Sequence, residues 1–254
     1  MILQPFGFMK SGAAATYAFL DLTSIQALYV SDNSEGYTLY QTNTCSTAVT
    51  SDSDPIGSCC HSTMPDLTQA TAAFKPTWRN AANGINGTPA ASFDGGDYLS
   101  GGSISEANDA FTVFAVFTVA SATSTRGIVS AGTLTSCRGI ATDATTGYVR
   151  FRSSNASALP TTYDCGDGNP HAVIAYGTYT GPTYDVHVWA DGSQRANGAV
   201  TCNSLSSVAF SPGYIQALAA YHNGKMSVCG YCQAELSGAE LTGLQNQLMD
   251  MAGL

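Results

Sequence analysis

Two loop-like stretches of the chain carry tyrosine rings, and the first of them also carries acidic side chains. They read "TTYDCGDGNP" (161–170) and "YTGPTY" (179–184). An exposed ring offers an apolar surface for stacking, and a few well-placed polar groups beside it fix the orientation of a ligand. The pattern predicts a carbohydrate-binding site that uses Tyr163, Tyr179, Tyr184, Asp164 and Asp167.

Other side chains have a structural explanation beside a functional one. Trp78 and Trp189 are expected in the core, Trp189 especially, because it falls in an alternating apolar run. Arg150 and Arg152 lie on one face of a predicted strand and could meet acidic ligands, although a solvated strand face is the default interpretation.

The stretch "FDGGDYL" (93–99) predicts a hairpin, made of a strand, a Gly-Gly turn and a second strand. Aspartates in such turns accept hydrogen bonds from backbone amides, which is the structural interpretation of Asp94. Calcium is the alternative, with Asp94 and Asp97 as ligands. Since calcium takes roughly six to eight oxygens, further acids such as Asp164, Asp167 or Asp191 would have to converge there.

Eight cysteines allow several kinds of chemistry. Disulfides formed in an oxidising medium and buried free thiols are the two main interpretations. Zinc is a third, because "CCH" (59–61) and "CGYC" (229–232) resemble half-sites, although adjacent cysteines ligate one metal poorly. The disulfide candidates are Cys45, Cys59, Cys60, Cys137, Cys165, Cys202, Cys229 and Cys232.

Catalytic patterns are weak. A glycosidase needs two carboxylates that flank the scissile bond, yet the four glutamates are dispersed, and the pairs Asp52/Asp54 and Asp164/Asp167 fall in predicted turns. The chain has no Gly-x-Ser-x-Gly elbow and no Gly-rich nucleotide loop. His171 and His187 fall in predicted strands and are expected to be structural. We therefore expect a protein that is not an enzyme.

The charge of the chain restricts its partners. Eighteen acids face nine Lys and Arg, a formal net charge of −9, and only 11% of residues are charged. Nucleic acids and anionic membrane surfaces both attract cationic proteins, so neither is an expected partner. No stretch is apolar and long enough to predict insertion into a membrane, and the first residues lack the basic region of a secretory signal.

Short apolar runs separated by Gly and Asn turns predict an all-β sandwich or barrel. The run "FTVFAVFTVA" (111–120) is apolar on both faces and is expected as a central strand. "ADGSQ" (190–194) and "HNGK" (222–225) are expected as hairpin turns. Further strands are predicted at 127–132, 138–142, 148–153, 171–177, 184–190, 214–221 and 225–231.

The two ends of the chain differ in pattern. Residues 1–20 show no clean period and are expected to form an N-terminal arm, followed by one domain over 21–254. Residues 236–253 predict a short helix, with Ser237 as N-cap and Glu240 in capping-box position. Its apolar stripe should dock on the sandwich, and consists of Leu241, Leu244, Leu248 and Met251.

Several ordered pieces resemble concanavalin A-like, LamG-type sandwich domains of tailed-bacteriophage virion proteins. The resemblance covers about residues 25–254, and its stretch "SCCHSTMPDLT" (58–68) departs from the usual turn. The similar pieces are "ALYVSD" (27–32), "TLYQTNTCSTAVTSDSDPIG" (38–57), "DLTQATAAFKPTWR" (66–79), "INGTPAASFDGGDYL" (85–99), "FTVFAVF" (111–117), "VHVWADG" (186–192) and "AELSGAELTGLQNQLMDMAG" (234–253).

This resemblance implies a two-sheet antiparallel jelly-roll fold and a structural role in a virion, as a capsid decoration, head fibre or tail-associated protein. It implies other virion proteins as partners, a homo-oligomer, and host cell-surface glycans as further partners. A free carbohydrate-binding module, with or without calcium, is the alternative, and a glycan hydrolase is a weaker one.

Overall fold

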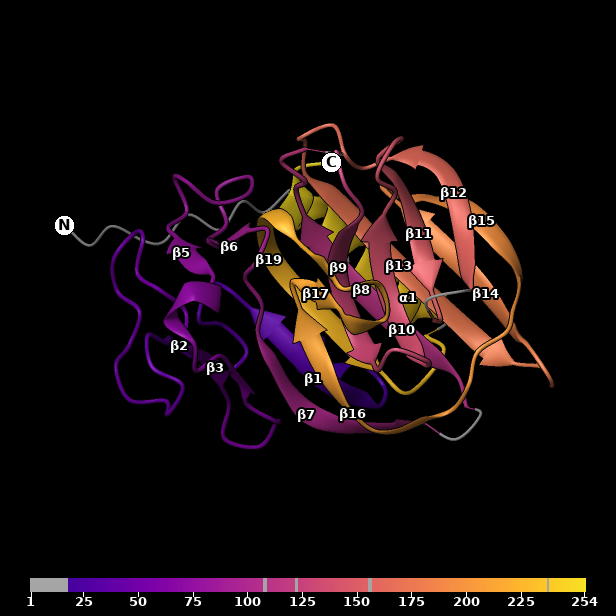
Figure 1. Ribbon diagram of the computed structural model, residues 1–254, viewed down its shortest axis with the longest axis horizontal. Helices are drawn as coiled ribbons and strands as arrows, with labels where there is room; N and C mark the ends of the chain where they lie inside the picture. The colour runs from indigo at the N-terminus through magenta and orange to yellow at the C-terminus, as the bar shows by residue number, and fades with distance from the viewer. Residues whose placement is uncertain (1–17, 107–108, 122, 155–156, 237) are drawn as a thin grey trace.

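The computed structural model describes residues 18–106, 109–121, 123–154, 157–236 and 238–254, which form two antiparallel sheets packed face to face (Figure 1). One α-helix, α1 (Gly238–Ala252), closes the chain. The predicted all-β sandwich with a short C-terminal helix is therefore confirmed. Most of the expected N-terminal arm, residues 1–17, lies outside the described residues, and Phe19–Asp21 forms the 3₁₀ turn η1.

The first sheet, called sheet A, has the fully buried strand β8 (Phe111–Phe117) at its centre. Each strand in it pairs antiparallel with its neighbours, and β1 pairs with the second half of β19. Its order is β15 (Ser193–Val200), β14 (Tyr184–Ala190), β13 (His171–Tyr179), β8 (Phe111–Phe117), β19 (Asn223–Cys232), β6 (Ala90–Asp94) and β5 (Thr77–Arg79), with β1 (Ile25–Val30) beside β19.

The second sheet, sheet B, packs against sheet A through its inner face. Its order is β12 (Ala158–Asp164), β11 (Tyr148–Arg152), β10 (Cys137–Thr142), β9 (Arg126–Gly132), β16 (Leu205–Pro212), β7 (Ser100–Glu106), β4 (Leu67–Thr68), β3 (Ser58–Cys60) and β2 (Thr38–Tyr40).

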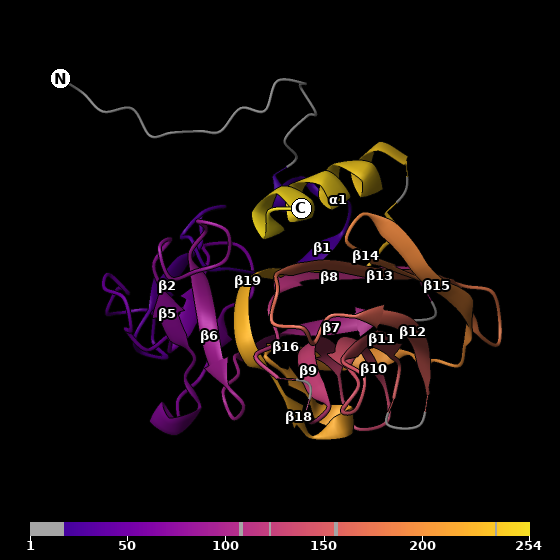
Figure 2. The same cartoon turned by 90° about the horizontal axis from the view of Figure 1, so that it is seen from above.

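Strand β8 is buried on both faces, as its sequence predicts, because each face has a different cover. Phe111 points inward and stacks on Phe151 of sheet B, with 5.1 Å between ring centroids. Phe114 points outward and stacks on Phe19 of η1 at 5.7 Å. Helix α1 covers the rest of this outer face, with Leu244 and Leu248 fully buried (Figure 2).

The helix follows its predicted apolar stripe. Leu241 and Met251 are partly buried against the core, in line with that stripe. Residue 237, the predicted N-cap, lies outside the described residues. The Glu240 carboxylate instead accepts hydrogen bonds from Thr23, at 3.0 Å from the amide and 2.6 Å from the hydroxyl, and so ties the helix to the start of β1.

Three local predictions are wrong. Residues 214–221 form two very short strands, β17 (Tyr214–Ile215) and β18 (Ala220–Tyr221), around the 3₁₀ turn η3 (Gln216–Leu218). Asn223 and Gly224 are not a hairpin turn, because both lie in β19 and pair with β6. The Gly-Gly stretch is not a hairpin either, since β6 belongs to sheet A and β7 to sheet B.

The turn at Asp191–Gly192 does join two paired strands, β14 and β15. Asp191 and Gly192 have φ of 50° and 74°, the left-handed conformation that such two-residue turns require. This hairpin prediction is confirmed.

Candidate functional site

Four aromatic rings gather beside the outer face of sheet B and form a continuous, partly exposed surface. We call Phe74, Tyr98, Tyr214 and Tyr221 the aromatic platform. Tyr214 and Tyr221 stack at 4.6 Å between centroids, and Tyr98 lies 5.4 Å from Tyr214 and 6.1 Å from Tyr221. Phe74 extends the row at 6.1 Å from Tyr98, and 42% of its surface is exposed.

The hairpin that carries two of these rings is held by close backbone contacts. β17 and β18 fold across the outer side of β9, away from α1 (Figure 2). A Cβ atom at Gly127 would lie 2.3 Å from the Ala220 carbonyl oxygen, so only glycine allows this approach. The Ser130 hydroxyl donates to the Tyr214 carbonyl at 2.9 Å.

A small apolar cluster anchors the far end of the hairpin. Ile215 and Ala217 pack on Cys137 and Ala141 of β10, and all four are buried. The rings are therefore mounted on a fixed support. A preformed surface of this kind loses little conformational entropy when it binds a ligand.

Polar side chains surround Gly95, in the loop that carries Tyr98. Asn223 Nδ2 and Arg126 Nη1 lie 3.6 and 3.7 Å from the position a Cβ atom on Gly95 would take. Asp94 is exposed on the same loop. We call Asp94, Arg126 and Asn223 the polar rim, which offers a carboxylate, a guanidinium and an amide next to the platform.

Asp94 and Asp97 act on their own turn. Asp94 Oδ1 accepts the Gly96 amide at 2.8 Å, and Asp97 Oδ2 accepts the Asp94 amide at 2.9 Å. Asp97 is 4% exposed, and burial, together with the nearby Asp94 charge, raises its pKa to about 6. These contacts match the structural interpretation of the stretch, and calcium binding here stays a prediction.

The predicted sugar site is split between two ends of strand β13. Tyr163 lies beside His171, at the start of the strand, with 6.1 Å between ring centroids. Tyr179 is the last residue of the strand, about 26 Å away at the usual rise per residue. The structure therefore does not bring the five predicted residues into one site.

At the first end, acidic side chains hold His171 from both sides. Its Nδ1 lies 2.7 Å from Asp191 Oδ2 and its Nε2 lies 2.9 Å from Asp167 Oδ1. Burial alone would lower the pKa of His171, but Asp191, Cys165 and Asp167 outweigh it and raise the pKa to about 11. His171 is thus a permanently charged structural group, as its strand position predicts.

The remaining predicted residues of this end have local partners. Tyr163 donates its hydroxyl to Asp191 Oδ2 at 2.8 Å, and Arg195 lies 3.7 Å above its ring centroid. Asp164 accepts the Gly166 amide at 2.7 Å. These bonds order the loop before β13.

At the other end, Tyr179 is exposed but Tyr184 is fully buried, so the prediction of Tyr184 as a stacking residue is wrong. Its hydroxyl donates to Glu106, as does that of Tyr231, each at 2.5 Å. Arg138 pairs with the same carboxylate at 2.5 Å, and both charged side chains are 0% exposed. Glu106, expected in a loop, thus joins the two sheets from inside the core.

Two further side chains differ from expectation. Trp189 is only partly buried and lines a small cavity beneath α1, together with Gly192 and Met249. Trp78 is also partly buried and donates its indole N–H to the Ser31 carbonyl at 2.8 Å.

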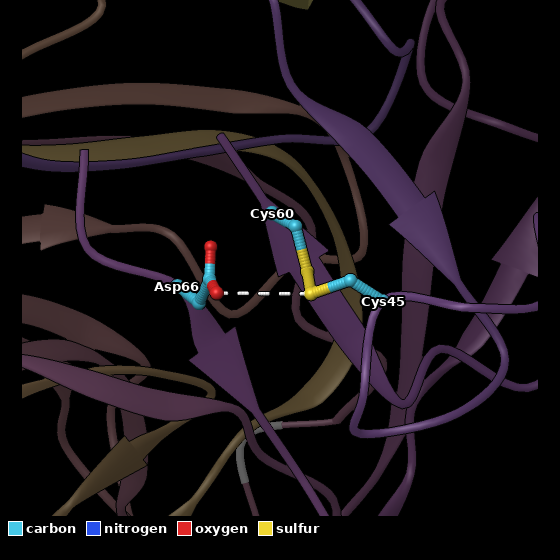
Figure 3. Close-up of side chains that lie close together, drawn as sticks. All are labelled: Cys45, Cys60 and Asp66. Carbon is cyan, nitrogen blue, oxygen red and sulfur yellow. Dashed lines mark hydrogen bonds between the residues drawn. A yellow bond between two sulfur atoms is a disulfide. The ribbon is translucent and has the colours of Figure 1, made fainter. Parts of the chain in front are cut away.

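One disulfide forms, between Cys45 and Cys60, and the other six cysteines are free and buried. Figure 3 shows Asp66 beside it, with Oδ2 3.7 Å from Cys45 Sγ. Within the described ranges, Cys45, Cys60 and Asp66 are the one group of three or more His, Cys, Asp or Glu side chains close enough to share a metal. The disulfide removes Cys60 as a thiolate ligand, and among the described residues Cys229 and Cys232 belong to no such group.

No protein-family model and no curated protein matches the chain. Its fold is similar to part of a Trypanosoma rangeli sialidase, with a TM-score of 0.54 and 16% identity, covering 91% of this chain and 37% of that chain. It also resembles domain 4 of AbnA, an extracellular arabinanase from Geobacillus stearothermophilus whose structure contains arabinotriose. The TM-score is 0.49 at 11% identity, and the match covers 90% of this chain and 98% of that chain.

A carbohydrate-binding domain of a Ruminococcus gnavus sialidase, bound to sialyllactose, has a TM-score of 0.42 and 15% identity, covering 58% of this chain and 84% of that chain. At these identities the likeness shows the fold alone. The chain spans little more than a third of the length of the first sialidase. No helix within the described residues is long and apolar enough to cross a membrane.

Proposed function

We propose that this protein is a lectin-like carbohydrate-binding module without catalytic activity, and that the aromatic platform and polar rim form its binding site. The observation that carries the proposal is the row of four neighbouring rings, all partly exposed, two of which are mounted on a fixed hairpin. Such a surface stacks on sugar rings, while the carboxylate, guanidinium and amide beside it are the groups that hydrogen bond to hydroxyls.

Several features support binding over hydrolysis. Glu106 lies in the core, where its carboxylate accepts hydrogen bonds from Arg138, Tyr184 and Tyr231. Asp94 is the one carboxylate of the polar rim, whereas a glycosidase needs two carboxylates across the scissile bond. Some solved structures with a similar fold contain bound sugars, which agrees with the proposal without carrying it.

A glycan array followed by titration calorimetry tests this function. The variants Tyr98→Ala and Tyr221→Ala should each weaken glycan binding by about tenfold or more, equivalent to about 1.4 kcal/mol. Tyr179→Ala removes an exposed tyrosine from the other predicted site and is the matched control. Failure of the intact protein to bind any glycan would overturn the proposal, and loss of binding only in Tyr179→Ala would move the site.

The setting of this activity is a separate proposal. The resemblance of residues 25–254 to phage virion domains supports a place in a tailed-bacteriophage particle, as a homo-oligomer that engages other virion proteins and host glycans. The fold that this resemblance implies agrees with the observed sandwich. Detection of the chain at fixed stoichiometry in purified particles would support this setting, and its absence from them would exclude it.

A further inference from the structure

Two arginines share the outer face of sheet B, beside the hairpin of the platform. Arg150 and Arg152 alternate on β11 with Val149 and Phe151, whose side chains fill the core, so both guanidinium groups lie on the outside. The hydrophobic cluster beneath η3 includes Ala141, which is the register partner of Arg150. The arginines are thus next to the segment that holds Tyr214 and Tyr221.

The guanidinium groups are incompletely paired. Arg150 contacts Asp143, whereas Arg152 has no ion pair with any residue that the structure describes. The Nε atoms of both arginines are buried and have no hydrogen-bond partner. Both side chains are partly exposed overall, so an incoming carboxylate would meet the terminal Nη groups of the guanidinium forks and not these Nε–H groups.

The strands on either side contribute no charge to Arg152. Its register partners are Gly139 on β10 and Ala158 on β12, and Arg150 pairs with Ala141 and Pro160. Burial lowers the pKa of both arginines, and for Arg150 the neighbouring Arg152 lowers it further. Among the described residues, Arg152 therefore leaves one positive charge without a counter-charge on this face, beside the ion pair of Arg150 with Asp143.

The arginines lie within reach of a ligand on the platform. Arg152 pairs with Gly139, which pairs with Ser130, and Ser130 bonds to the backbone of Tyr214. Two strand spacings amount to about 10 Å. A short oligosaccharide that stacks on the platform can therefore place another group above β11.

We propose that Arg150 and Arg152 bind the carboxylate of an acidic sugar, as an extension of the aromatic platform. The planar guanidinium fork matches the two oxygens of a carboxylate. This inference rests on the proposed carbohydrate-binding function and specifies the class of glycan, one that contains a uronic or sialic acid.

The first test compares sialyllactose with lactose, which differ by the acidic sugar. The intact protein should bind sialyllactose at least about tenfold more tightly, as expected for a charge-assisted hydrogen-bond pair. Arg152→Gln and the double variant with Arg150→Gln should remove this preference, whereas Arg79→Gln, which changes an arginine paired with Asp52, should retain it. Equal affinities for the two sugars, or a preference that survives the double variant, would overturn the inference and leave the proposed function intact.

A second test reads the site directly, whichever glycan is recognised. The ¹⁵N-labelled Nε–H signals of Arg150 and Arg152 are followed while sodium glucuronate is added at constant ionic strength. They should shift with saturation, while glucose leaves them unchanged and the Arg79 signal stays in place. Absence of a shift, or the same shift with sodium acetate, would overturn a site for acidic sugars. If the platform variants lose all glycan binding but retain these shifts, the proposed arginine site stands while the platform is the site of the other contacts.

Discussion

At the scale of single residues, the sandwich encloses two charged side chains, which need partners inside the core. Glu106 and Arg138 are both fully buried and form an ion pair, and two tyrosine hydroxyls also donate to the carboxylate. Removal of one partner from such a pair leaves an uncompensated charge in the interior. The stability of the protein should therefore depend strongly on this one carboxylate.

Glu106→Gln should lower the free energy of unfolding by about 3 to 5 kcal/mol, because the Arg138 guanidinium loses its counter-charge. Urea titration monitored by circular dichroism measures this change. Tyr231→Phe, which removes a single hydrogen bond to the same carboxylate, is the control and should cost about 1 to 3 kcal/mol. A Gln variant as stable as the natural chain would show that the pair contributes no net stability.

Asp97 makes the free energy of unfolding depend on pH. Its pKa is raised to about 6 in the folded protein, against about 3.9 for an unfolded chain, so folding favours the protonated form. The stabilising contribution is complete below pH 4 and is lost as the pH rises through 6, a change of about 1 to 3 kcal/mol.

The free energy of unfolding of the natural chain, taken relative to that of Asp97→Asn, should decline between pH 4 and pH 6, measured by urea titration of both proteins across the range. The comparison with the variant removes the opposite contribution of His222, whose pKa burial lowers to about 4. Millimolar calcium should leave the profile of the natural chain unchanged if the turn binds no ion. Disappearance of the decline on addition of calcium, and its return with chelator, would instead support the calcium interpretation of Asp94 and Asp97.

At the scale of elements, the β17–β18 hairpin determines whether the platform exists. Gly127→Ala would push a methyl group against the backbone of this hairpin, at 2.3 Å from Ala220 O and 2.7 Å from Ile215 N. We expect a loss of about 1 to 3 kcal/mol in stability, and weaker glycan binding, because the two stacked tyrosines shift away from Tyr98.

Gly198→Ala is the matched control on β15, where the nearest atom, Leu159 Cδ1, would lie at 3.4 Å and no hairpin is displaced. Calorimetric titration with a bound glycan and urea unfolding distinguish the two variants. Unchanged affinity in a folded Gly127→Ala protein would argue against the hairpin as the support of the binding site.

The elements that the sequence predicts well are those with a strong local pattern. "FTVFAVF" is apolar on both faces and is β8, and the alternating runs at 148–153 and 184–190 are β11 and β14. The prediction of a single strand at 214–221 is wrong because the apolar pattern alone does not reveal that η3 interrupts the strand after two residues.

The candidate site is harder to predict, because its rings come from separate parts of the chain. Phe74, Tyr98, Tyr214 and Tyr221 meet only after the two sheets have formed, and no spacing in the sequence indicates it. Glu106 was missed for the same reason, since its partners Arg138, Tyr184 and Tyr231 are 32, 78 and 125 positions away. The shared face of Arg150 and Arg152 could be predicted, because strand alternation is local.

At the scale of the whole molecule, the cysteines divide into one covalent link and an inert interior. The Cys45–Cys60 bond closes a loop with a sequence separation of 15 residues at the edge of sheet B, near β2 and β3. Closure of such a loop in the unfolded chain corresponds to about 3 kcal/mol. Burial raises the pKa of the Cys59 thiol to about 12, which suppresses its thiolate form.

The double variant Cys45→Ser with Cys60→Ser should lose about 3 kcal/mol of stability, and reductant should lower the natural chain to the same level while leaving the variant unaffected. Thiol titration supplies the second measurement. The oxidised native protein should react slowly or not at all, and six thiols should react after unfolding in urea. Eight reactive thiols in the untreated, unfolded protein would contradict the bond.

The two outer faces of the sandwich carry different elements. Phe19 of η1 packs on the outer side of sheet A, where α1 also lies, whereas the β17–β18 hairpin is on the outer side of sheet B (Figure 2). A tag or a linker joined to the C-terminal helix would therefore leave the molecule on the side away from the platform. Protein immobilised through α1 should display its rings outward, and a dense layer of such molecules would form a multivalent surface in which many weak sites act together.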